Sequence, residues 1–348
     1  MKSYIQPQAP GLFDYDNRLA ELTRQGDLLH RLDQVIDWDL FVSPMETALA
    51  TQPQGPGGRP AWPPKMMFKL LVLQRLYNLS DEQTEYQLLD RLSFQRFAGL
   101  TLADKAPDQN TLYDFREALT QAAVFDQLFA LFGEQLAQQG LLPKEGHIVD
   151  ATFVEVPRQR NTREENAQIK AGQVPPAWEE RPQKRCHKDL DARWTKKGEA
   201  VYYGYKDHVK VNAASKLIEA AEVTNAAVHD SQALEALVEA GDGPTYADSA
   251  YNGEPVAECL AEKGVEGRII EPARRGRELT ARQKRSNRTK SRVRARGEHV
   301  FSVLSGQAGR VFLRYIGLVR NRAAVVLLNL VYNFVRYEQI ERLSLLKV

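Results

Sequence analysis

The chain has 348 residues, with 43% hydrophobic and 26% charged residues and a formal net charge of +2. This length predicts about two domains with a substantial core. The cysteines, Cys186 and Cys259, lie outside any CxxC motif, which excludes a disulfide framework and a zinc ribbon. Residues 1–10 lack an apolar signal core, and the most apolar segment, Ala323–Phe334, is shorter than a bilayer span. We therefore expect a cytoplasmic protein without a membrane partner.

Residues 1–140 are predicted to form a helical domain. Apolar residues recur through Lys65–Asn78 after two prolines, and Ser80 with Gln83 forms the capping-box pattern of a second helix that runs to about Arg91. The two helices are a helix-turn-helix candidate, for which we predict DNA binding that includes Lys65 and Arg91. A structural helical hairpin would show the same pattern. Further helices are predicted after residues 107–111 and over Val124–Gln138.

From Gly146 the pattern changes to strands. Gly146–Val156 is rich in β-branched residues, and residues 157–201 follow as a charged insertion expected to be extended or a loop. Tyr202–Asn212 and Leu217–Thr224 read as a hairpin. The remaining predicted elements are a helix capped by His229, Asp230 and Ser231 that runs to about Ala240, a strand that ends at Asp248, a helix over Pro255–Lys263, a strand over Gly267–Ile270 and a helix that contains Glu298. The order βββαβαβα predicts an α/β fold over residues 141–348, an RNase H-like domain with a mixed five-stranded sheet flanked by helices.

The segment Arg274–Arg296 is strongly basic. Eleven of its 23 residues are Lys or Arg, and Glu278 is its single acid. Phosphates neutralised by such residues release counterions, which favours nucleic-acid binding. A merely solvated basic segment would have the same composition. The predicted DNA contacts are Arg282, Lys284, Arg285, Arg288, Lys290, Arg292 and Arg294.

Three acids occur in three different local contexts. Asp150 interrupts a β-branched run, Asp248 ends a short strand, and Glu298 follows the basic segment. A lone carboxylate among apolar residues is costly to bury, and a metal ion would offset that cost. Carboxylates are the protein ligands that Mg²⁺ prefers, and two such ions can activate and stabilise the oxygens of a phosphodiester exchange. We therefore predict that all three acids are both catalytic residues and metal ligands, for Mg²⁺ with Mn²⁺ as a substitute.

Each acid has a structural alternative. Asp248 is also a plausible helix N-cap or Asx-turn residue, and Glu298 could be a solvated helix residue. Arg294 precedes Glu298 by one helical turn on the same face, where a guanidinium suits a phosphate. Asp207 is the acid that we hold in reserve as an additional ligand.

Several short motifs, in this order, resemble those of bacterial insertion-sequence transposases of the DDE class, in the insertion-sequence-five family. The matching pieces are Asp150-Ala151-Thr152, Gly204-Tyr205-Lys206-Asp207-His208, Val228-His229-Asp230-Ser231, Ala247-Asp248-Ser249-Ala250-Tyr251, Arg294 to Phe301, and Arg314-Tyr315-Ile316-Gly317-Leu318. The likeness covers nearly the whole chain.

The resemblance implies an RNase H-like DDE endonuclease domain whose triad is Asp150, Asp248 and Glu298, and cut-and-paste DNA transposition. It also implies double-stranded DNA as the partner, at element ends and at the target, with a homodimer on DNA. Related transposases carry Tyr-x2-Arg-x3-Glu-x6-Lys, whereas here Ser291 and Ser305 replace the Tyr and Lys. Two alternatives remain: a domesticated, non-catalytic DNA-binding protein, and an RNase H-like nuclease without strand transfer.

Overall fold

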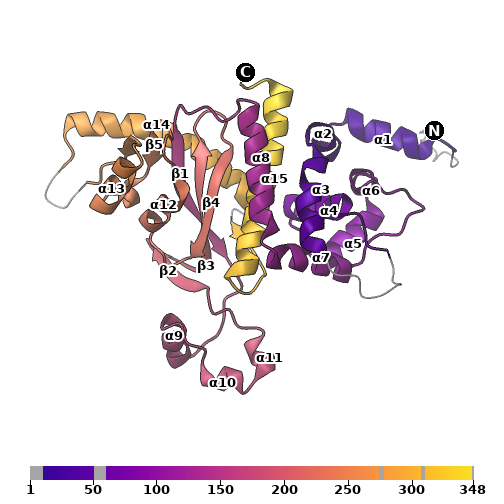
Figure 1. The fold of residues 1–348 in the computed structure, drawn as a ribbon, viewed down its shortest axis with the longest axis horizontal. Helices are drawn as coiled ribbons and strands as arrows, with labels where there is room; N and C mark the ends of the chain where they lie inside the picture. Colours follow the sequence, from indigo (N-terminus) through magenta and orange to yellow (C-terminus); the bar gives the residue numbers. More distant parts are fainter. Residues whose placement is uncertain (1–10, 51–59, 274–277, 307–309, 347–348) are drawn as a thin grey trace, which may run out of the picture. The chain divides into compact units, whose positions relative to one another are not determined.

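The computed structural model describes residues 11–50, 60–273, 278–306 and 310–346. Residues 1–10 and the first part of the basic segment, 274–277, lie outside this range. The chain divides into two compact units, Met1–Ala118 and Leu119–Val348. Figure 1 shows the helices of the first unit and the sheet of the second.

The first unit is helical, as predicted. Its elements are α1 (Asp14–Arg24), α2 (Leu28–Val35), η1 (Trp38–Phe41), α3 (Val42–Leu49), α4 (Pro64–Tyr77), α5 (Asp81–Asp90), α6 (Leu92–Ala98) and the start of α7 (Gln109–Gln121). The capping box of α5 is present, because Ser80 and Gln83 exchange side-chain to backbone hydrogen bonds. Asn78 ends α4 in the left-handed conformation. The two helices predicted over 65–91 are therefore confirmed.

Helix α4 lies in the core of this unit. Most of its residues from Met66 to Gln74 are buried. Aromatic rings surround it, with Phe68 against both Trp38 and Phe41. The guanidinium of Arg116 binds both carboxylate oxygens of Asp81, at 2.6 and 2.7 Å, and fixes the start of α5 to α7.

A mixed sheet forms the centre of the second unit. Its strands are β1 (His147–Glu155), β2 (Arg193–Lys197), β3 (Ala200–Asn212), β4 (Ile218–Asn225), β5 (Thr245–Ala247), β6 (Gly267–Ile269) and β7 (Val311–Phe312). The predicted strand over 146–156 and the predicted hairpin are confirmed as β1 and β3–β4. Five strands follow in the spatial order β4-β3-β1-β5-β6, and β2 and β7 add short pairings to β3 and β1. The described sheet therefore has seven strands, which corrects the predicted five.

Strand β1 has different partners on its two edges. It pairs antiparallel with β3 along its full length, from His147 opposite Asn212 to Glu155 opposite Gly204. On its other edge it pairs parallel with β5 at two residues only, and with β7 near its end. Between these two short pairings lies the middle of β1.

Helices cover both faces of the sheet, as expected for the α/β class. One face contacts α8 (Val124–Gln138), α14 (Ala281–Ser305) and α15 (Leu318–Leu343), and the other contacts α12 (Leu234–Leu237) and α13 (Glu254–Glu262). Helix α8, expected with the N-terminal helical domain, packs against α15 through Phe132 and Phe334 in the second unit. Helices α8 and α15 lie side by side in Figure 1. The helix after His229 is shorter than predicted, because it ends at Leu237.

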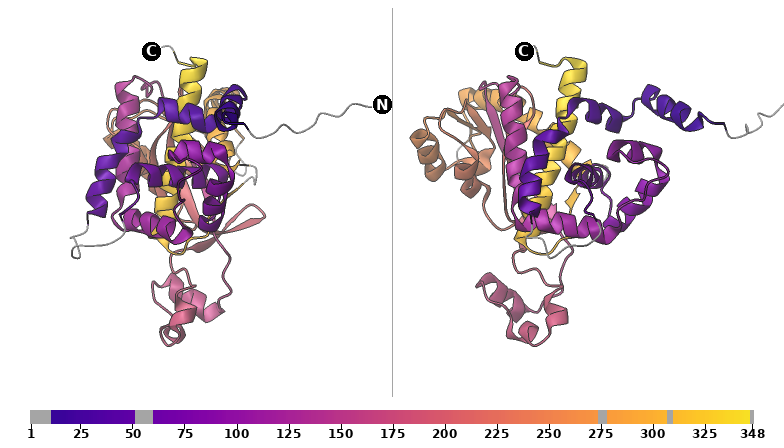
Figure 2. Two further views of the ribbon diagram at one scale, coloured as in Figure 1. Left: turned by 90° about the vertical axis from the view of Figure 1, so that its right-hand side faces the viewer. Right: turned by 45° about the vertical axis from the view of Figure 1, so that its right-hand side comes forward.

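The charged insertion after β1 is folded, which corrects the expected loop. It forms α9 (Arg163–Lys170), α10 (Pro176–Glu179) and α11 (Pro182–Arg185), followed by β2. Thr162 and Glu165 cap α9, and Glu165 also accepts hydrogen bonds from Trp178 and Lys184. One buried tryptophan and this carboxylate therefore organise the lobe. In all views it projects beyond β2 (Figures 1 and 2).

Helix α15 is longer than the apolar segment predicted for it. With 26 residues and a mean hydropathy of 1.2 in its most apolar window, it could cross a membrane by length and composition alone. Of that window, 67% is buried inside the molecule. The side-chain amide of Asn333 binds the backbone N–H and carbonyl of Ile218 in β4, which ties the helix to the sheet edge. These contacts are those of a core helix, and core helices can also meet the criteria of length and composition for a membrane span.

Gly297 allows α14 to approach β1 closely. A Cβ atom on Gly297 would lie 3.1 Å from Cγ2 of Ile148, whereas one on Gly133 in α8 would meet nothing within 4 Å. We therefore expect Gly133→Ala to stabilise the protein by roughly 0.5–1 kcal/mol, as is usual in a helix. Gly297→Ala should fall short of that gain by about 1 kcal/mol or more, because Ile148 must move. Urea unfolding of the two variants measures the difference, and equal gains would contradict the close approach.

Candidate functional site

The register of β1 and β5 brings the two predicted aspartates together. His147 lies opposite Thr245 and Ile148 opposite Tyr246. Asp150 and Asp248 each lie two residues beyond the second of these pairs, at corresponding positions of the two chains, where β5 has just ended. Asp248 follows the last residue of β5, and its carboxylate accepts the N–H of Ala250 at 2.8 Å. Asp248 therefore does form the predicted turn. This hydrogen bond uses one carboxylate oxygen, and the other remains available for a metal ion.

The third predicted acid is on the helix that covers this part of the sheet. Gly297 of α14 lies against Ile148, and Arg294, one turn earlier, donates a hydrogen bond to Asp150 at 2.8 Å. Glu298 is one turn after Arg294 and is exposed. Ser291 is exposed and Ser305 is the last residue of the helix. Val303 is 43% exposed, while Val300 and Leu304 are buried.

The pKa of Arg294 shows how strongly the nearby acids act on this part of the site. Burial alone would lower the pKa of Arg294, since it disfavours the charged guanidinium. The hydrogen bond to Asp150 and the negative charges of Asp150, Asp248 and Glu298 outweigh burial, so the pKa is raised. Arg294 thus lies within electrostatic reach of all three predicted acids.

On the opposite face of β1 and β3, further polar groups lie close to these acids. Lys206 forms an ion pair with Asp230 at 2.7 Å. Tyr251, in the turn after Asp248, is 1% exposed, and its hydroxyl makes no hydrogen bond within the described structure. Burial and then the charges of Asp230, Asp150 and Asp248 raise the pKa of Tyr251 well above its ordinary value. These groups were not predicted as part of the site.

The basic segment is helical and mostly exposed. The exposed members of the predicted set are Arg282, Lys284, Arg285, Arg288 and Arg292. Lys290 differs, because its ammonium donates to the backbone carbonyl of Ile269 at 2.7 Å. Asn287 likewise binds the backbone of Glu271. Two polar side chains therefore attach this half of α14 to the end of β6 and leave the basic face in solvent.

In the first unit, the predicted contacts are engaged within the protein. Lys65 forms an ion pair with Asp39 at 2.7 Å, and Arg91 lies over the rings of Tyr77 and Phe94. Helix α5 contains Asp81, Glu82, Glu85 and Asp90 but neither Lys nor Arg. Such a helix disfavours close approach to phosphates.

Asp207, the reserve ligand, is turned into the core. It is 1% exposed, lies on the α15 face of β3 and accepts a hydrogen bond from Asn329 at 3.2 Å. Burial raises the pKa of Asp207 to about 7, and the Asn329 hydrogen bond opposes this shift. A carboxyl group in this position is part of the protein interior, so the ligand interpretation of Asp207 is corrected.

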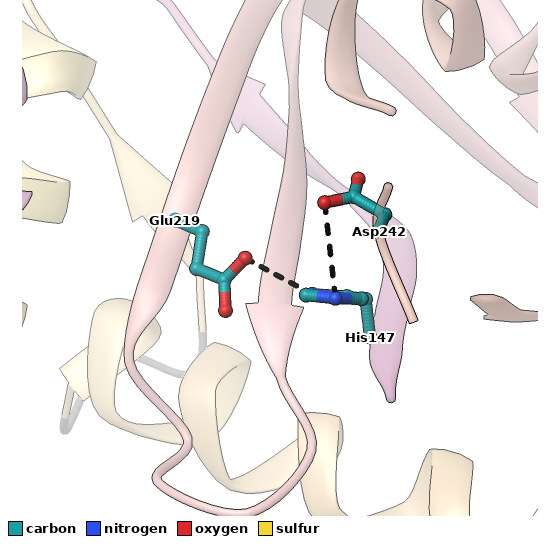
Figure 3. A group of neighbouring side chains, drawn as sticks. All are labelled: His147, Glu219 and Asp242. Atoms are coloured by element: carbon teal, nitrogen blue, oxygen red, sulfur yellow. Dashed lines mark ion pairs between the residues drawn. The ribbon is translucent and has the colours of Figure 1, made fainter. Parts of the chain in front are cut away.

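A second acidic group has the spacing of a metal site. Within the described ranges, the side chains of His147, Glu219 and Asp242 could hold a metal ion, since one donor atom from each lies within 4.8 Å of the others. Asp150, Asp248 and Glu298 do not form such a group in this part of the chain, and the guanidinium of Arg294 lies against Asp150 instead. Figure 3 shows the imidazole of His147 between the two carboxylates. Sequence reasoning missed these residues, which come from three segments far apart in the chain.

Two family matches identify the chain. Residues 17–118 match the family described as "Transposase domain (DUF772)". Residues 142–334, more than half of the chain, match the family described as "Transposase DDE domain". The chain therefore belongs to the DDE transposase family, and its function is DNA transposition. Membership implies nuclease or transposition activity on DNA, and DDE transposases use divalent metal ions.

A solved structure described as the piggyBac transposase synaptic complex with hairpin DNA is also similar. The match covers 91% of this chain and 76% of that chain, with a TM-score of 0.43 and 10% identity. A likeness of this size carries no argument about the fold or site of this chain.

The raised pKa of Asp207 predicts a specific pH dependence. An unfolded aspartate has a pKa of about 3.9, so the stability contributed by protonated Asp207 is present below that value and is lost as the pH rises through about 7. Asp207→Asn imitates the protonated form and can donate to the Oδ1 of Asn329, which has no hydrogen bond. We expect equal melting temperatures for the variant and wild type near pH 4 and a higher one for the variant at pH 8. Asp90→Asn, at an exposed position, is the control, and a variant less stable than wild type at pH 8 would contradict the prediction.

Proposed function

We propose that Asp150, Asp248 and Glu298 are the catalytic carboxylates of this transposase and hold Mg²⁺, for which Mn²⁺ can substitute. The observation that supports this most directly is the position of Arg294, whose guanidinium binds Asp150 at 2.8 Å and whose pKa is raised by the charges of all three acids although burial opposes the shift. Negative charge from two strands and a helix is concentrated there. That is the charge distribution that a pair of divalent cations requires.

The oxygens of these residues fit such ions. Asp248 uses one carboxylate oxygen for the N–H of Ala250, and Asp150 uses Oδ1 for the N–H of Ala151 and Oδ2 for Arg294. The backbone hydrogen bonds orient both carboxylates, as neighbouring donors commonly do for metal ligands. Glu298 is exposed and contributes a further hard oxygen ligand. Arg294 is the one partner that must leave Asp150.

The chain's own residues then carry distinct parts of the reaction. When bound, the divalent ions supply activation of the attacking oxygen and stabilisation of the leaving oxygen. Arg294 balances the charge of Asp150 in the free protein and turns to a phosphate of the DNA substrate, where a planar guanidinium binds two oxygens. Ser305 offers only a neutral hydrogen bond where relatives have a lysine. The water or 3′-OH that attacks is oriented by the groups around Asp150.

We further propose the RNase H-like fold and the insertion-sequence-five family for this chain. The spatial order β4-β3-β1-β5-β6 supports the fold, because the first three strands are antiparallel and the last two are parallel. The order of motifs from Asp150 to Leu318 supports the family. Residues 1–140 are proposed as the DNA-binding region and residues 141–348, with the insertion 157–201, as the catalytic region.

The proposed substrate is double-stranded DNA, at the ends of the element and at its target, bound by a homodimer in the cytoplasm. The exposed arginines of α14 support the DNA partner, since they form one basic helix face next to the proposed centre. The two alternatives predict different reaction products. A domesticated DNA-binding protein gives no cleaved DNA, and a nuclease without strand transfer gives cleaved but not joined DNA. DNA flanking the gene supplies the substrate, because paired inverted repeats would mark the element ends.

Neutral substitutions test the three carboxylates. We expect Asp150→Asn, Asp248→Asn and Glu298→Gln each to lower Mg²⁺-dependent cleavage of an end-containing duplex by more than about a hundredfold, because each removes a metal ligand. DNA binding should stay within a fewfold of wild type. Gel assays of cleavage and of strand joining, with fluorescence anisotropy for binding, measure both steps.

Glu155→Gln is the matched control, because it lies on the same strand and pairs with Arg310 instead. It should cleave like wild type. A triad variant that cleaves near the wild-type rate is not a ligand, and wild-type cleavage without any joined product would identify a nuclease without strand transfer.

The basic face of α14 is tested by salt dependence. Replacing Arg282, Lys284, Arg285 and Arg288 by Gln should weaken binding to random duplex DNA. It should also reduce the slope of log affinity against log salt by about 0.9 for each lost phosphate contact. Lys290→Gln is the control, since Lys290 binds Ile269 and should alter stability without altering the slope. An unchanged slope in the variant with all four substitutions would show that this face contacts solvent and not DNA phosphates.

A further inference from the structure

His147, Glu219 and Asp242 come from three segments that meet where the sheet begins. His147 is the first residue of β1, Glu219 lies near the start of β4, and Asp242 lies in the loop before β5 (Figure 3). None of them belongs to the proposed catalytic centre. At a rise of about 3.3 Å per residue, Asp150 is roughly 10 Å further along β1.

The imidazole of His147 is buried without a hydrogen bond. His147 is 2% exposed, and neither ring nitrogen has a hydrogen-bond partner in the described structure. Glu219 Oε2 lies 3.0 Å from Nδ1 and Asp242 Oδ1 lies 3.9 Å from Nε2. Both oxygens are close enough for an ion pair with a protonated ring, yet neither makes a well-directed hydrogen bond to it. A buried imidazole without a hydrogen bond is costly, and a cation bound to one ring nitrogen and both carboxylates would satisfy all three groups.

Each carboxylate has one oxygen held by the protein and one turned to the histidine. Asn212 donates to Glu219 Oε1 at 2.7 Å. Lys210 and the backbone N–H of Glu239 donate to Asp242 Oδ2, at 3.0 and 2.9 Å. The remaining oxygens, Oε2 and Oδ1, face His147. Donors that fix one oxygen and leave the other available are typical of the surroundings of metal ligands.

We propose that His147, Glu219 and Asp242 bind one divalent transition-metal cation, of the Zn²⁺ or Mn²⁺ class. Metal bonds of about 2.0–2.2 Å in a tetrahedron separate the ligand atoms by about 3.4 Å. His147 would offer one ring nitrogen, and one donor atom from each of the three residues already lies within 4.8 Å of the other two, so small side-chain movements would complete this geometry. One imidazole nitrogen among carboxylate oxygens favours this class over Mg²⁺, which takes oxygen ligands.

Lys210 sets the affinity of this site. Its ammonium lies 3.0 Å from Asp242 Oδ2 and 3.8 Å from Glu219 Oε2, and so already supplies one positive charge. A divalent cation therefore binds against the repulsion of Lys210. If the cluster binds a metal ion, removing the charge of Lys210 should strengthen that binding. If the cluster is only a network of ion pairs, there is no metal binding, and removing Lys210 creates none. The two interpretations of the cluster thus differ in a measurable way.

A cation here would join the beginnings of three elements of the sheet. β1 leads from His147 to Asp150, and β5 follows Asp242 and leads to Asp248. Since β1 and β5 pair at only two residues, a bond between their starts would hold the register that sets the two aspartates side by side. The cation is structural and takes no part in the proposed chemistry.

The test uses the tag-free, full-length variant Asp150→Asn/Asp248→Asn/Glu298→Gln, in which the proposed catalytic ligands are absent. We expect ZnCl₂ or MnCl₂, but not MgCl₂, to raise its melting temperature, and titration calorimetry to give one ion per chain. Adding His147→Gln should abolish both effects. Adding Lys210→Met should tighten binding at least about tenfold.

No Zn²⁺ or Mn²⁺ binding in the triad variant would overturn the proposal, as would binding that persists unchanged with His147→Gln. If His147→Gln does not fold, Asp242→Asn takes its place, and the Lys210→Met comparison decides independently: binding no tighter than with Lys210 would overturn the proposal. These outcomes do not depend on cleavage, so they are separate from those that test the catalytic carboxylates.

Discussion

The pairing of β1 with its neighbours is the constraint on which the second unit depends. β3 pairs with β1 along its whole length and buries it as a central strand, while β5 and β7 pair only near its two ends. Asp150 lies between these two short pairings, so it is fixed by a rigid strand and is still 21% exposed. A longer β5 would pair with the middle of β1 and close the edge on which Asp150 lies. The early end of β5 therefore creates the place where an acid from each strand can face a substrate.

Charge is balanced differently on the two faces of this sheet. On the α14 face the ion pair of Arg294 and Asp150 is partly exposed, with 22% and 21% of the two side chains in solvent, and in the proposed function Arg294 is a removable counter-charge. On the other face the polar side chains of β3 are buried and have fixed partners: Lys206 binds Asp230, His208 binds Thr224, and Lys210 binds Asp242. Burial lowers the pKa of His208 to about 4, more than Asp230 raises it, so this imidazole is neutral near pH 7. The fixed pairs on this face hold β1 and β3 in place, while on the α14 face the proposed function requires Arg294 to leave Asp150.

Local patterns predicted the elements that are stabilised locally. The capping box at Ser80, the β-branched run of β1 and the apolar period of α8 each specify an element without reference to the rest of the chain. The fold of the insertion cannot be predicted from its local pattern, because it depends on Trp178 meeting Glu165, thirteen positions earlier in the chain. The burial of Asp207 cannot be predicted from the sequence either. The alternation along a strand shows which residues share a face, but not which face a later helix such as α15 will cover. The His147 group could not be predicted at all, since its members meet only when β1, β4 and the loop before β5 assemble.

Helix α14 joins the two regions proposed to meet DNA. Its first half is attached to β6 through Asn287 and Lys290 and presents its arginines to solvent, and its second half enters the core at Gly297, Val300 and Leu304. Because an α-helix rises about 1.5 Å per residue, Arg288 is held roughly 15 Å from Glu298 along one rigid axis. In the proposed complex, a phosphate bound at the first position would fix which phosphate can reach the acids. Distance along this helix, more than any contact to a base, would then select the bond that is cut.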